Sequence, residues 1–121
     1  MSVDQAISNI PDEIMNYLMD QRKRERDAVR EKEVIKERIK KLQDILNLLE
    51  DREGGLTCTI SSGNIYQQST VQKVRDRVSA NISINTIHLL EAHDRLLIIQ
   101  ENLNRDYEMV CDNVNRIGTA N

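Results

Sequence analysis

The side chains that most often carry chemistry in proteins stand in no catalytic pattern in this sequence. The two histidines, His88 and His93, are five residues apart. On a helix they therefore do not share one face, as two metal ligands four residues apart would. No serine or cysteine stands in a nucleophile motif, and there is no glycine-rich phosphate-binding loop. The sequence predicts no enzyme activity, no cofactor and no metal site.

The two cysteines, Cys58 and Cys111, are far apart and form no disulfide or metal motif. Since a free cysteine behaves as a small hydrophobic residue, we interpret both as buried side chains in a reducing compartment. No basic region followed by an apolar core marks a secretory signal. The longest apolar run, residues 96–99, is far below the roughly 18 residues that span a bilayer. We expect a cytoplasmic protein with no membrane contact.

The composition is that of long helices rather than of a compact globule. The 121 residues include no Trp, no Phe and three Tyr, and 31% are charged. Aromatic side chains normally supply much of a globular core, so such a core would be poorly filled here. The net charge of −3 predicts no general affinity for nucleic acids or anionic membranes. The basic-looking run after Gln21 is interrupted by acidic residues, which argues against a DNA-reading helix.

A first helix is predicted over about residues 11–52. Pro11 suits the first helical turn, and Asp12 and Glu13 carry the charge that a helix N-terminus favours. Apolar residues then recur at alternating steps of four and three, which is a heptad pattern. They are Ile35, Ile39, Leu42, Leu46 and Leu49. Extended backwards, the same row is polar in its middle and apolar again at Leu18 and Ile14.

A small β-hairpin is predicted over about residues 56–68. Leu56, Cys58 and Ile60 alternate with hydroxyl side chains, and this period of two is typical of a strand. The following Ser-Gly-Asn sequence indicates a turn.

A second helix is predicted over about residues 70–117, with Ser69 or Thr70 as its cap and Gly118 at its end. Its heptad row is mainly apolar and comprises Val78, Ile82, Asn85, Leu89, Ala92, Leu96, Ile99, Leu103, Asp106, Val110, Asn113 and Ile117. A second apolar set lies off this row and predicts contact with further chains. It comprises Ile84, Ile87, Leu90, Leu97 and Ile98. Asn85 either selects register and partner or is a tolerated polar residue.

The fold class that follows is mainly α: two long helices form an antiparallel coiled-coil hairpin, joined by one short β-hairpin, in a single domain over residues 1–121. This order resembles a prefoldin subunit of the β type. The similarity in sequence is concentrated at Ser62, Gly63, Asn64, Ile65 and Tyr66, and at Ser69, Thr70 and Val71. The linker has room for one hairpin, whereas α-type subunits carry two. The second strand is more polar than is usual in the family.

The resemblance implies a subunit of a hetero-hexameric, ATP-independent holdase that contains other prefoldin-type subunits. It would bind unfolded clients, such as actin-like and tubulin-like chains, and deliver them to a chaperonin. An isolated two-stranded hairpin is only marginally stable in water. Pairing of the hairpins of several subunits into a barrel would remove their exposed edges. The predicted assembly residues are Leu56, Cys58, Ile60, Ile65 and Tyr66.

The helix ends that carry the chain termini are predicted to bind clients, as the tentacle tips do in prefoldins. The predicted tip residues are Ile7, Ile10, Ile14, Met15, Leu18, Met19, Met109, Val110, Val114 and Ile117. Methionine suits a surface that accepts varied partners. Alternatively, these residues only hold the two helix ends together.

Two other functions remain open: a coiled-coil scaffold subunit of a multi-subunit adaptor or tethering complex, and a kinetochore or cytoskeletal component. β-structure at residues 56–68 would favour prefoldin over the adaptor.

Overall fold

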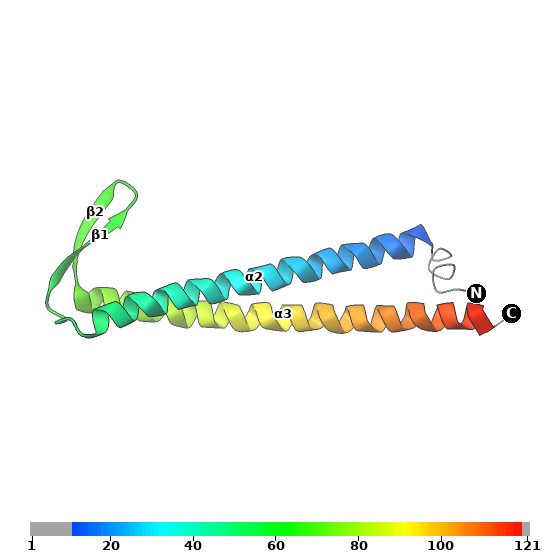
Figure 1. Ribbon diagram of the computed structural model, residues 1–121. Coiled ribbons are helices and arrows are strands. Elements are labelled where there is room, and N and C mark those ends of the chain that lie inside the picture. Colours follow the sequence, from blue (N-terminus) through cyan, green and yellow to red (C-terminus); the bar gives the residue numbers. More distant parts are fainter. Residues whose placement is uncertain (1–10, 120–121) are drawn as a thin grey trace. The chain divides into compact units, whose positions relative to one another are not determined.

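The computed structural model describes the backbone of residues 11–119 and the side chains of residues 11–113 (Figure 1). Two long helices flank an antiparallel β-hairpin, which confirms the predicted fold class. The elements, in chain order, are α2 (Asp12–Glu50), β1 (Thr57–Ser62), β2 (Ile65–Thr70) and α3 (Val71–Thr119). Among the described residues, no helix is long and apolar enough to cross a membrane.

The chain divides into two compact units, and each takes a part of both helices. The hairpin unit is Lys32–Glu91 and contains β1 and β2. The termini unit comprises Met1–Glu31 and Ala92–Asn121.

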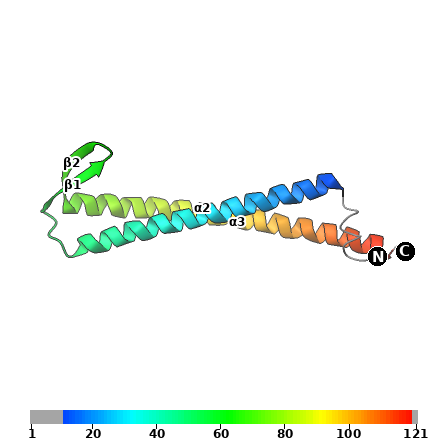
Figure 2. The same cartoon turned by 45° about the horizontal axis from the view of Figure 1, so that its top comes forward.

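The hairpin unit is held together by the heptad rows that the sequence predicted. Ile35 on α2 and Val78 on α3 are buried, and Ile39, Leu46 and Leu89 are half-buried. The two helices run antiparallel here (Figure 2), and two side-chain contacts agree with this. Arg38 meets Asn85, whereas Leu49, later in α2, meets Arg75, earlier in α3.

Among the residues that the structure describes, Asn85 is the one polar residue that is buried. Its Oδ1 accepts a hydrogen bond of 3.2 Å from Nη1 of Arg38, and its Nδ2 donates one of 2.8 Å to the Asn81 carbonyl. Both ends of the amide are thereby paired, as a buried polar group requires. A role in selecting register stays a prediction.

The termini unit has its own core of buried Leu18, Ala28, Ala92, Leu96 and Leu103. Its helices are also joined by polar contacts at their margin. Arg95 Nη2 lies 2.7 Å from Glu31 Oε1, and the Tyr17 hydroxyl donates a 3.0 Å hydrogen bond to Asp106 Oδ2.

The β-hairpin turns tightly at Gly63 and Asn64, between the paired residues Ser62 and Ile65. Gly63 has a φ of 62°, and no other described residue has a positive φ. A positive φ at the first central position alone is the signature of a type II′ turn, which requires glycine there. This turn matches the right-handed twist of the strands, so the Ser-Gly-Asn sequence fixes the register of the hairpin.

The hairpin passes directly into α3 without a loop. The Val71 amide donates to the Leu56 carbonyl at 2.8 Å, which continues the ladder one step past the strands. Thr70 Oγ1 accepts a 3.2 Å hydrogen bond from the Lys73 amide, as an N-cap residue does. Thr70 is therefore both the last residue of β2 and the cap of α3.

Candidate functional site

The β-hairpin has one apolar and one mainly polar face, set by its register. Ile60 lies opposite Gln67, and Ser62 lies opposite Ile65. Directly opposed residues share a face, and successive residues alternate between faces. Ile60 and Ile65 therefore lie on one face, together with Cys58. Tyr66, which the sequence placed in the same assembly set, lies on the opposite face.

The apolar side chains of the hairpin are open to solvent. Ile65 is 71% exposed, Tyr66 73% and Leu56 47%, while Cys58 and Ile60 are half-buried. The described sheet has only two strands, so each strand has an edge with unpaired backbone groups. An exposed apolar face beside free edges is a template for pairing with another strand.

Arg75 joins the end of α2 to the start of α3. Its Nε donates to the Leu49 carbonyl at 2.9 Å, and its Nη2 donates to the Glu50 carbonyl at 3.2 Å. Nη2 also donates to the carbonyls of Leu49 and Arg52. The carbonyls of Leu49 and Glu50 belong to the last turn of α2, where carbonyls lack a partner within the helix, and that of Arg52 lies two residues beyond it. The Leu49 carbonyl also accepts from the Arg52 amide at 3.2 Å. The guanidinium thus caps α2 and joins the end of α2 to the start of α3, on either side of the β-hairpin.

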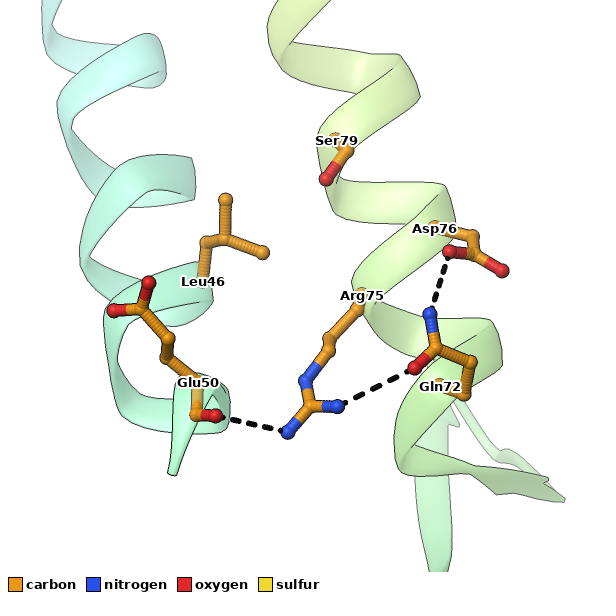
Figure 3. A pocket seen from close by; sticks show the side chains of 6 residues that line it. All are labelled: Leu46, Glu50, Gln72, Arg75, Asp76 and Ser79. Atoms are coloured by element: carbon orange, nitrogen blue, oxygen red, sulfur yellow. Dashed lines mark hydrogen bonds between the residues drawn. The ribbon is translucent and has the colours of Figure 1, made fainter. Parts of the chain in front are cut away.

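Figure 3 shows how the neighbouring side chains orient this guanidinium. Gln72 Oε1 accepts a 3.3 Å hydrogen bond from Arg75 Nη1, and Gln72 Nε2 donates one of 2.9 Å to Asp76 Oδ1. The cavity here is lined by Leu46, Glu50, Gln72, Arg75, Asp76 and Ser79. The Arg75 guanidinium, the Gln72 amide and the Asp76 carboxylate are paired with one another and with the helix end, so their role here is structural.

Sequence reasoning missed the Arg75 cap. The available signal was the last turn of α2, which contains no basic residue to meet its free carbonyls. That absence indicates a cation from elsewhere in the chain, but heptad counting does not identify which one.

The predicted tip residues differ in exposure. Leu18 is 5% exposed and belongs to the core of the termini unit, and Met15 and Val110 are half-buried. Ile14, Met19 and Met109 are 40%, 65% and 60% exposed. Ile7 and Ile10 lie outside the described residues, and so do the side chains of Val114 and Ile117.

The unit that contains the exposed tip residues also has polar and aromatic contacts between and along its helices that sequence reasoning missed. The hydrogen bond that Tyr17 donates to Asp106 raises the pKa of the Tyr17 hydroxyl above its ordinary value. The guanidinium of Arg22 lies 5.6 Å from the centre of the Tyr107 ring, a cation–π arrangement, and it pairs with Glu25 at 2.9 Å.

The predicted burial of both cysteines is wrong for Cys111, which is exposed, while Cys58 is intermediate. Cys111 directly follows the heptad residue Val110, so its side chain points away from the helix contact. Neither forms a disulfide. In the described part of the chain, no three acidic, histidine or cysteine side chains gather into a possible metal site.

No protein-family model and no curated protein matches the sequence. A structural match exists to the crystal structure of the prefoldin beta subunit from Thermococcus strain KS-1, with a TM-score of 0.79. It covers 88% of this chain and 96% of that chain. The chain has the fold of a prefoldin beta subunit. At 14% sequence identity the two share this prefoldin fold with few residues in common, which confirms the resemblance at the level of fold.

Proposed function

We propose that this chain is a β-type subunit of a hetero-oligomeric, ATP-independent holdase of the prefoldin kind. In this role it binds unfolded proteins, such as actin-like and tubulin-like chains, in the cytoplasm and delivers them to a chaperonin. One observation carries the proposal: a single β-hairpin with an exposed apolar face joins two long antiparallel helices, as in the prefoldin fold.

The proposed assembly element is the β-hairpin. A two-stranded sheet is marginal in water, and pairing with the hairpins of other prefoldin-type subunits would satisfy its free edges. The face that carries Ile60 and Ile65 would become the interior of that assembly, with Cys58 and Leu56 at its margin. Strands are present where a rod-like adaptor subunit would have a plain loop, which favours this assembly over the adaptor.

The proposed client-binding residues are Ile14, Met19 and Met109, the exposed members of the tip set, of which Ile14 and Met19 lie on different sides of α2. Binding there would be non-directional burial of apolar surface, at about 25 cal/mol per Å², so it needs no nucleotide and tolerates varied clients. Leu18 has a different role in this proposal, because it is buried: it holds the two helices together.

The assembly is tested by placing charges on the apolar face of the hairpin. Ile60→Asp with Ile65→Asp should abolish co-purification with partner subunits, because an unpaired buried charge costs several kcal/mol. Helical content by circular dichroism should be nearly unchanged. The matched control is Ser61→Asp with Gln68→Asp, which places two charges on the opposite face of the same strands and should leave more partner bound. Normal recovery of the Ile60 and Ile65 double variant with its partners would exclude the hairpin as the assembly element.

The client surface is tested on the intact complex. Ile14→Ser, Met19→Ser and Met109→Ser together should weaken suppression of the aggregation of a denatured client, followed by light scattering. Size exclusion should show unchanged assembly. Three other exposed apolar residues, all on α2 and outside the tip set, provide the control by substitution with Ser: Val29, Val34 and Leu48. Equal protection by both variants would leave the tip residues as helix contacts only, and loss of assembly would favour an adaptor.

A further inference from the structure

The outer side of α3 in the hairpin unit is apolar, and α2 does not cover it. Ile84, Ile87 and Leu90 are 50%, 56% and 60% exposed. From residue 78 to residue 90 there is no Asp, Glu, Lys or Arg, although 31% of the chain is charged. An exposed helix face without charges is unusual for a surface that stays in water.

Two of the three hydroxyl side chains in this stretch, those of Ser83 and Thr86, are already paired within the helix. Ser83 Oγ donates to the Ser79 carbonyl at 3.2 Å, and Thr86 Oγ1 donates to the Ile82 carbonyl at 2.7 Å. Covering this face would therefore leave neither hydroxyl donor unsatisfied.

The exposed residues form a second heptad row, distinct from the row that packs on α2. Arg77, Ala80, Ile84, Ile87 and Glu91 follow one another at steps of three and four. All five are exposed. Arg77 and Glu91 each lie about 10 Å along the helix from Ile84, on opposite sides of it. Neither forms an ion pair within the described part of the chain.

We propose that this row, Arg77–Ala80–Ile84–Ile87–Glu91, docks a second copy of the chain in the antiparallel orientation. Along the chain, the row runs from a basic residue through apolar residues to an acidic residue. When a second copy runs in the opposite direction, the basic end of each row therefore faces the acidic end of the other. In an antiparallel pair, the Arg77 end of each copy lies against the Glu91 end of the other, and the isoleucines pack between them. A parallel pair would place like charges together. A two-fold interface uses the same patch on both copies, as a self-complementary row requires.

This inference goes beyond the proposed chaperone function and uses no residue of the β-hairpin. Its test is sedimentation equilibrium of the purified 121-residue chain. Arg77→Glu and Glu91→Arg should each raise the dissociation constant of the dimer about tenfold, because each makes two attractive charge pairs repulsive. The combined substitution restores opposite charges in the reversed order and should return the constant to the original value.

Two further variants keep the result unambiguous. Lys40→Glu makes the same charge change on an exposed position of α2 and should have no effect, while Ile87→Asp should abolish the dimer with helical content unchanged by circular dichroism. The Ile60→Asp and Ile65→Asp double variant should still dimerise, so this interface and the hairpin assembly can fail separately. A dimer constant insensitive to Arg77→Glu and Glu91→Arg would overturn the proposal, as would failure of the combined substitution to restore it.

Discussion

The Arg75 cap supports a quantitative prediction about how the two helices are joined. Arg75→Ala removes the guanidinium that donates to the carbonyls of Leu49, Glu50 and Arg52. A hydrogen bond from a charged donor contributes about 1.5–3 kcal/mol, and a cation at a helix C-terminus a further 0.3–1 kcal/mol. Water replaces part of this, because the site is only half-buried. We expect Arg75→Ala to lower the free energy of unfolding by about 2 kcal/mol.

Arg75→Lys separates the charge from the geometry of the guanidinium. Lysine keeps the positive charge near the end of α2, but it cannot donate through a planar fork to several carbonyls at once. It should therefore lose about 1 kcal/mol, since the helix dipole contribution remains. Lys73→Ala is the control: Lys73 is an exposed cation in the first turn of α3, and no described contact joins its side chain to α2. Its loss should cost less than about 0.5 kcal/mol.

The assay is urea unfolding followed by circular dichroism of the helices, at one fixed chain concentration for every variant, since association contributes to apparent stability. The expected order of unfolding midpoints is wild type and Lys73→Ala together, then Arg75→Lys, then Arg75→Ala. A midpoint for Arg75→Ala equal to that of Lys73→Ala would refute the role of Arg75 as a cap. Equality of the two Arg75 variants would show instead that geometry, not charge, is decisive.

Three further predictions concern single positions. Leu103→Ala should destabilise the chain by about 2–4 kcal/mol in the same urea assay, because Leu103 is 2% exposed, whereas Ile98→Ala, at 58% exposed, should change little. Gly63→Ala should cost about 1–2 kcal/mol, seen as faster hydrogen exchange of the hairpin amides, because its φ of 62° is strained for alanine. Tyr17 donates to Asp106, which raises its pKa in the folded state, so its stabilisation is complete below the ordinary tyrosine pKa and is lost as the pH rises through the raised value. Phenolate absorbance should show a late-titrating component that Tyr17→Phe removes; unchanged titration would exclude this.

The hairpin shows how local sequence can specify a local structure almost completely. Gly63 is the residue that the positive φ of the turn requires, and the alternation around Ile60 is the period of a strand. The separation of Ile60 and Tyr66 onto opposite faces was not predicted. It depends on which residues of the two strands pair, and a shift of one residue would reverse it.

The candidate surfaces were predicted only in part, because burial depends on the neighbouring helix. Met19 is exposed as a client surface requires, yet Leu18, next to it in the sequence, is buried. Hydrophobicity is the same signal for both. The heptad row separates these two, since it includes Leu18 and not Met19, but Ile14 lies on the same row and is 40% exposed. Only the packing against α3 decides which residues of the row are buried.

The sequence by itself determined the two helices and their heptad rows, the tight turn, and the order helix, hairpin, helix, since these follow from periods of 3.5 and 2 and from the backbone preferences of glycine. Only the tertiary structure decided which distant groups meet: Arg75 with the end of α2, Arg38 with Asn85, and Tyr17 with Asp106. The physical reason is that side-chain pairs between helices depend on the axial alignment of the two helices. Their repeating apolar rows permit several alignments, and the polar pairs are satisfied in one.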